Sequence, residues 1–187
     1  MAAGALGGIL VKLARGGGAA SGLVGTLGGP ENASKQRLFG PLEFAITPKA
    51  NNPEAITITN GWDTANIVDV HIPQLNRTVE FHRKGADRLA ALFAAWEAAG
   101  LMPLVLSFDG SWVPRLIRGS KSTLSEHAFG MAFDINANWN PYKQPPSPSG
   151  TVGSTADLAP IAQQLGWRWG GSFGAAYADP MHFELTS

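Results

Sequence analysis

Between residues 42 and 82 the hydrophobic and polar positions alternate over short runs. Four such runs are rich in Ile, Val, Thr and Phe, and segments containing Pro, Asn and Gly separate them; they are residues 42–47, 55–59, 66–73 and 78–82. Near-alternation of this kind is typical of strands that bury one face. The pattern therefore predicts four short strands joined by turns.

Residues 84–99, "KGADRLAALFAAWEAA", follow a different period. Their large apolar side chains recur at positions i, i+3, i+4 and i+7, which are Leu89, Leu92, Phe93 and Trp96. This spacing places them on one face of an α-helix, and Gly100 follows where a helix C-cap is expected. We expect an amphipathic helix whose aromatic face packs in the core.

The second half of the chain continues the mixture of strands and helices. Residues 102–108, "MPLVLSF", resemble a buried strand, and the polar stretch that follows them, residues 109–124, resembles a long loop. A Pro/Ser/Gly loop at 138–155 precedes a short helix at 156–166, and "HFEL" at 182–185 is strand-like. Strands clustered around one or two helices predict a small single α+β domain.

The N-terminal composition differs from the rest. Residues 1–30 are mostly Gly and Ala, and Lys12 and Arg15 are their only charged residues before the final Gly-Gly-Pro. We expect a flexible or weakly helical arm at residues 1–40 and a domain at 41–187. The two charges do not precede a long apolar run, which disfavours a signal peptide, and no apolar stretch approaches the roughly 20 residues that span a bilayer.

Charge and cysteine content narrow the possible partners and cofactors. Fourteen Lys and Arg balance fourteen Asp and Glu, so no basic surface indicates nucleic acid. The chain has no cysteine, which excludes disulfides, a thiolate nucleophile and a zinc–thiolate site. A metal site would therefore need histidine and carboxylate ligands.

The stretch "SEHAFGMAFDIN", residues 125–136, places a histidine and a carboxylate among apolar residues. From Met131 the side chains alternate as in a strand, so Asp134 points away from the face of Phe133. Gly130 permits a sharp turn before that strand. The turn would bring His127 to the same face as Asp134.

A second group of polar residues lies in "DPMHFEL", residues 179–185. His182 and Glu184 project from one face of the expected strand, and Asp179 stands three residues before His182. If this strand neighbours the strand of Asp134, then His127, Asp134 and His182 converge, with Asp179 close by.

Two imidazoles and one carboxylate make a three-ligand zinc site with a fourth position left for water. Zinc lowers the pKa of that water to about 7, and a further carboxylate, for which Asp179 is the candidate, can act as general base and acid. Arg115 or Arg118 could stabilise the oxyanion that develops when water attacks an amide. The alternative is structural: a buried Asp134 needs a partner, and either arginine could pair with it.

These residues resemble a family of bacterial cell-wall zinc peptidases, which includes D-alanyl-D-alanine carboxypeptidases, vancomycin-resistance D,D-dipeptidases and phage L-alanyl-D-glutamate endopeptidases. The family pattern is Ser-x-His-x-x-Gly-x-Ala-x-Asp, followed later by an acid three residues before a second His. The matching residues in this sequence are Ser125, His127, Gly130, Ala132 and Asp134, then Asp179 and His182. The resemblance covers residues 60–187 and leaves out the Gly/Ala arm.

The resemblance implies that His127, Asp134 and His182 are the zinc ligands and that Asp179 is the catalytic base. Asp rather than Glu at residue 179, with "WGG" at 169–171, is similar to the phage endopeptidase branch. The family arginine corresponds to Arg115, with Arg118 as a rival.

The resemblance further implies that Ser125 helps to orient the site, and for Glu184 we expect a hydrogen bond to a ligand. It also implies an α+β domain with a central antiparallel sheet, helices on one side and zinc in a cleft.

Three functions stay open at this point. The first is a zinc-dependent endopeptidase, like an endolysin, that cuts L-Ala-D-Glu in peptidoglycan stem peptides. The second is a D-alanyl-D-alanine carboxypeptidase or dipeptidase, and the third a non-enzymatic module stabilised by zinc. For an enzyme we expect a monomer that acts in the cell wall or periplasm, binds a stem peptide and binds no nucleic acid.

Overall fold

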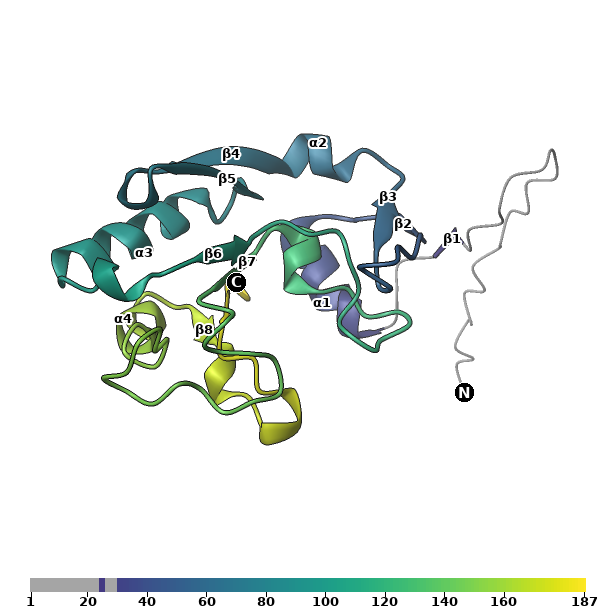
Figure 1. Ribbon diagram of the computed structural model, residues 1–187. Coiled ribbons are helices and arrows are strands. Elements are labelled where there is room, and N and C mark those ends of the chain that lie inside the picture. Colours follow the sequence, from purple (N-terminus) through teal and green to yellow (C-terminus); the bar gives the residue numbers. More distant parts are fainter. Residues whose placement is uncertain (1–23, 26–29) are drawn as a thin grey trace, which may run out of the picture.

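The computed structural model describes residues 24–25 and 30–187, which form a small α+β domain with antiparallel sheets (Figure 1). Residues 1–23 and 26–29, on which most of the predicted arm falls, lie outside the described residues. The helices are α1 Pro30–Phe39, α2 Trp62–Asn66, α3 Ala86–Ala98 and α4 Ala159–Gln164. Within the described parts of the chain, no helix has the length and apolar character needed to cross a membrane.

The strands form three sheets. A three-stranded sheet has the order β1 Val24–Gly25, β2 Phe44–Ile46, β3 Ile56–Ile58, and a two-stranded sheet pairs β4 Ile67–Ile72 with β5 Arg77–His82. A four-stranded sheet has the order β6 Phe108–Gly110, β7 Ala132–Ile135, β9 His182–Glu184, β8 Arg168–Trp169. The four strands predicted between residues 42 and 82 are therefore confirmed as β2 to β5.

Helix α3 covers the four-stranded sheet with the face that the sequence predicts. All four of its predicted core residues are buried, and they are Leu89, Leu92, Phe93 and Trp96. The ring of Phe93 lies 5.7 Å from that of Phe133 on β7, and the ring of Trp96 lies 5.7 Å from that of Phe183 on β9, measured between centroids. These aromatic contacts fix the two central strands from one side.

The buried strand predicted for residues 102–108 is wrong. A 3-10 turn occupies Met102–Leu104, and only the last residue of the segment enters β6. Pro103 favours the turn because it has a fixed φ and no backbone N–H for a ladder. The backbone N–H groups of Leu106 and Ser107 donate instead to the side-chain oxygen of Asn136, at 2.7 and 3.1 Å.

Helix α1 is held against the segment that leads to His127. The buried side chain of Asn32 donates to the carbonyl of Ser122 at 2.8 Å and accepts from the N–H of Leu124 at 2.9 Å. Lys35 donates to the carbonyl of Leu124 at 2.8 Å and forms an ion pair with Glu126 at 2.5 Å. The packed part of the chain thus includes residues 31–39, which lie within the range 1–40 expected for the arm.

Two histidines, His71 and His82, lie outside the two motifs that are predicted to bind a metal. His71 is exposed, whereas His82 is buried beside the rings of Phe39 and Trp62. Its Nδ1 accepts from a backbone N–H at 3.0 Å, and burial lowers its pKa. His71 is therefore a surface residue and His82 a packing residue.

Candidate metal centre

Strands β7 and β9 are neighbours, as the site prediction requires. They pair antiparallel, with Asp134 directly opposite His182. Alternation along β7 places Phe133 and Ile135 in the core, so Asp134 projects to the other side of the sheet. Two of the three predicted ligands are thereby brought together by strand register alone.

A 3-10 turn, Glu126–Phe129, presents the third predicted ligand, His127. The side chain of Ser125 caps this turn by accepting from the N–H of His127 at 3.3 Å. Gly130 ends the turn with a φ of 63°. A Cβ on Gly130 would lie 2.7 Å from Ile67 and 3.0 Å from the backbone nitrogen of His82, so glycine suits this close approach.

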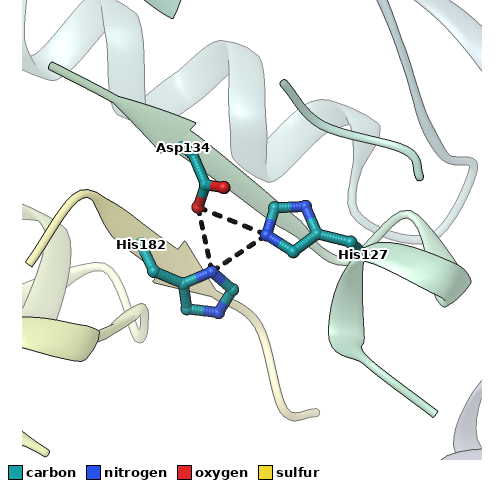
Figure 2. A group of neighbouring side chains, drawn as sticks. All are labelled: His127, Asp134 and His182. Carbon is teal, nitrogen blue, oxygen red and sulfur yellow. Dashed lines mark hydrogen bonds and ion pairs between the residues drawn. The ribbon is translucent and has the colours of Figure 1, made fainter. Parts of the chain in front are cut away.

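The three side chains point toward one another (Figure 2). His127 Nε2 lies 3.2 Å from Asp134 Oδ1, His182 Nδ1 lies 3.0 Å from the same oxygen, and the two nitrogens are 3.0 Å apart. Ligands about 2.1 Å from a tetrahedral zinc ion lie roughly 3.4 Å from one another. Within the described residues this is the one group of histidine and acidic side chains close enough to hold a metal ion.

Hydrogen bonds to the outer ring nitrogens of His127 and His182 decide which nitrogens face the centre of the group with lone pairs. Nδ1 of His127 lies 2.7 Å from the carbonyl oxygen of Ser111, and Nε2 of His182 lies 3.0 Å from Oε2 of Glu184. Each outer nitrogen faces an acceptor and so carries a proton, and the inner nitrogens are then the ones that can offer a lone pair to a cation or bind a further proton. Two lone pairs and a carboxylate oxygen then meet, and only a cation or a proton between them relieves their repulsion. The donor set fits a bound zinc ion.

Electrostatics within the group agree with a site for a cation. Burial acts to raise the pKa of Asp134, but the two histidines hold it well below its usual range. Burial would lower the pKa of His182, yet Asp134 and Glu184 raise it to about 10. The carboxylates thus favour positive charge at this position.

Glu184 links the group to the sheet edge. Only 3% of Glu184 is exposed, and its second oxygen pairs with Arg168 at 2.7 Å. A buried carboxylate without partners would be costly, and here it has one on each oxygen. This arrangement orients the ring of His182.

Asp179 stands beside the group with one oxygen unpaired. Its Oδ1 is buried and has no hydrogen-bond partner among the described residues. Burial raises the pKa of Asp179, and Asp134 acts in the same direction. The residue lines a hollow of about 160 Å³ together with His182 and Arg115. A carboxylate of raised pKa that faces an open hollow can both accept and release a proton.

The two candidate arginines differ in their surroundings. Arg115 is half-buried, and its pKa is lowered by burial although the charges of Asp134 and Asp179 act against the shift. Arg118 is exposed, and its guanidinium lies 5.8 Å from the ring centre of Tyr142. Arg115 is thus the arginine whose charge interacts with the acids of the site, and neither arginine forms an ion pair with Asp134 within the described residues.

Two groups that support the site escaped the sequence predictions. The carbonyl oxygen of Ser111, which accepts the hydrogen bond from Nδ1 of His127, is a backbone atom, so the residue type gives no signal. Arg168, the partner of Glu184, lies on β8 in the segment "WRW". A charged residue between two tryptophans is the sequence signal that could have indicated a buried ion-pair partner.

Gly170 allows a close approach to the backbone of Asp179. A Cβ there would lie 2.2 Å from the carbonyl oxygen of Asp179, and the N–H of Asp179 donates to the carbonyl of Gly170 at 3.0 Å. We expect Gly170→Ala to displace Asp179 and to lower kcat by at least about tenfold, equivalent to 1.4 kcal/mol. Because the metal-binding side chains are not touched, zinc content should stay unchanged.

Steady-state kinetics and metal analysis of Gly170→Ala test this expectation. Gly174→Ala is the matched control, because a Cβ at Gly174 meets no atom within 4 Å and should leave kcat unaltered. Equal kcat in both variants would contradict the packing argument.

Comparison with known proteins supports the family resemblance. The chain matches the family model described as D-alanyl-D-alanine carboxypeptidase over residues 118–185. The matched segment includes all three residues of the metal group and Asp179, and confirms the resemblance to zinc peptidases over that part. No curated protein and no solved structure matches the chain.

Proposed function

We propose that this chain is a zinc-dependent peptidase that hydrolyses peptidoglycan stem peptides as an L-alanyl-D-glutamate endopeptidase. The observation that carries the proposal is the convergence of two imidazole lone pairs and one carboxylate oxygen beside the unpaired oxygen of Asp179. The family match supports a peptidase. We further propose that the protein acts in the cell wall or periplasm and works as a monomer.

His127, Asp134 and His182 would hold the zinc ion through the three inner atoms. When bound, the ion supplies a Lewis acid and lowers the pKa of a water molecule at its open position to about 7. Asp179 would take a proton from the attacking water and hand it to the departing amine nitrogen. Its raised pKa suits this second step. A carboxyl group of higher pKa keeps the proton that it has taken from water until the amine nitrogen accepts it.

Arg115 would stabilise the oxyanion that develops on the amide carbonyl. Its charge interacts with Asp134 and Asp179, and it lines the same hollow as Asp179, so a substrate carbonyl there would meet a positive group. Arg118 packs near Tyr142 at the rim of that hollow and would contact the substrate farther from the reacting atoms. We therefore propose Arg115 as the catalytic arginine.

The family description favours a second candidate, a D-alanyl-D-alanine carboxypeptidase. The hollow beside Asp179, of about 160 Å³, would hold a single terminal residue. Arg115 or Arg118 could bind the carboxylate of that residue. A non-enzymatic zinc module is disfavoured because a structural site needs neither an open position nor an unpaired acid such as Asp179.

Product analysis distinguishes the two enzymes. Zinc-loaded protein is incubated with purified peptidoglycan, and new amino termini and released amino acids are identified. New N-terminal D-Glu supports the endopeptidase, whereas free D-Ala supports the carboxypeptidase. Protein treated with a chelator is the control and should release neither; hydrolysis that survives chelation would refute a metallopeptidase.

A further inference from the structure

The metal group is accessible from two adjoining hollows. The first, of about 160 Å³, contains His182 and Asp179 in its wall. The second, of about 320 Å³, contains His127 and Asp134. Arg115 lines both, as does Arg118, so the two hollows meet at these side chains. A substrate placed across the metal group would therefore extend into both.

The outer wall of the second hollow comes from the turn between β2 and β3. Four consecutive residues of this turn line it, and they are Asn51, Asn52, Pro53 and Glu54. This part of the chain lies outside the segment that matches the family model. The wall is thus a feature of this chain that the family match does not describe.

Hydrogen bonds tie this wall to the loop of the two arginines. The N–H of Leu116 donates to the carbonyl of Glu54 at 2.9 Å, and the N–H of Gly119 donates to its carboxylate at 3.0 Å. The N–H of Ile56 donates to the carbonyl of Pro114 at 3.1 Å, and Ala55 forms a β-bridge with Arg115. The turn and the arginine loop are therefore joined, and Glu54 holds the loop at Leu116 and Gly119, the residues that follow the two arginines.

The location of Asp179 assigns a direction to the substrate. Asp179 lines the first hollow only, and it must deliver a proton to the nitrogen released when the C–N bond breaks. The amine half of the substrate therefore belongs in the first hollow. The acyl half, which ends at the attacked carbonyl, belongs in the second.

We propose that the second hollow is the subsite for the acyl half of the substrate and that Asn51 and Asn52 bind its amide groups; this rests on the proposed function. A side-chain amide offers both a donor and an acceptor, which matches a peptide backbone. The volume of the second hollow falls at the lower end of ligand sites, which span about 300–1,000 Å³. The first hollow is half that size, so recognition would favour the acyl side of the cut bond.

Binding of an uncut ligand tests the subsite without relying on turnover. Two probes with the same amine half are used, N-acetylmuramoyl-L-alanyl-D-glutamate and N-acetyl-L-alanyl-D-glutamate, which differ only in the size of the acyl half. Their Kd values are measured by calorimetry on zinc-loaded Asp179→Asn protein, with and without Asn52→Trp. We expect the tryptophan to fill the hollow and to weaken the larger probe at least tenfold and the smaller probe less than threefold.

Val152→Trp is the matched control because Val152 is 70% exposed and lines neither hollow. Asn51→Trp, at an exposed position of the same turn, provides a second variant if Asn52→Trp does not fold. Unchanged Kd for the larger probe, or equal weakening of both probes, would overturn the subsite. Absence of peptide products from the zinc-loaded wild-type protein, with the larger probe still bound by the Asp179→Asn protein, would instead overturn the proposed reaction.

Discussion

Asparagine in place of Asp179 will lower kcat on a stem peptide by about 10²- to 10⁴-fold, the usual contribution of a general acid and base. Asparagine has nearly the shape of aspartate but cannot accept a proton from water or deliver one to an amine. Because Asp179 is not part of the group of His127, Asp134 and His182, zinc content should stay at one ion per chain. Kinetics on a synthetic stem peptide and metal analysis of the same sample measure the two quantities.

Asp69→Asn is the control for this replacement, since Asp69 is an exposed carboxylate on β4. It should leave both kcat and zinc content unaltered. If Asp179→Asn kept more than a tenth of wild-type kcat with zinc bound, Asp179 would not be the base, and another acid that faces the hollow, such as Glu126, would have to be tested.

Alanine in place of His127 will remove zinc and activity together. The change deletes one of three donor atoms and leaves the carbonyl of Ser111 without its partner. Loss of the metal forfeits several kcal/mol of transition-state stabilisation, so activity should fall by at least about 10³-fold. Metal analysis after dialysis and hydrolysis assays measure both effects, with His71→Ala, an exposed histidine, as the control.

Thermal unfolding provides a readout of this variant that is independent of turnover. Free zinc at a concentration of 100 times its Kd raises the free energy of unfolding by about 2.7 kcal/mol if it binds only the folded state. Added zinc should therefore raise the Tm of the wild type and of His71→Ala and leave that of His127→Ala almost unchanged. An equal rise in all three proteins would show that the ion binds elsewhere.

The core of the site could be predicted from sequence because its geometry is mostly local. Alternation along β7 fixes the direction of Asp134, and Gly130 fixes the turn that brings His127 back. The prediction also requires one contact between distant parts of the chain, namely that the strand of His182 lies next to the strand of Asp134. The pairing of β7 with β9 confirms this contact. Pairs of residues three or seven positions apart in the sequence, Asp179 with His182 and His127 with Asp134, thus suffice to predict most of the site.

The surroundings of the site could not be predicted because they depend on contacts between distant parts of the chain. Nothing in the composition of residues 51–54 indicates that this turn faces His127 across a hollow. The apolar run at 102–108 likewise suggested a strand, and the side chain of Asn136, some thirty residues later, satisfies its backbone instead. Short patterns identify chemistry, whereas the shape of the cleft arises from tertiary packing.

The attachment of α1 affects how long a bound ion would remain in place. Within Glu31–Phe39 only Asn32 and Phe39 are buried, so few apolar contacts hold the helix, and weakly packed segments open before a protein unfolds as a whole. Each opening would free the backbone of Leu124, 92 residues from Asn32, and loosen the approach to His127. We therefore expect the rate at which a bound ion is released to depend on the undocking of a helix that contributes no ligand.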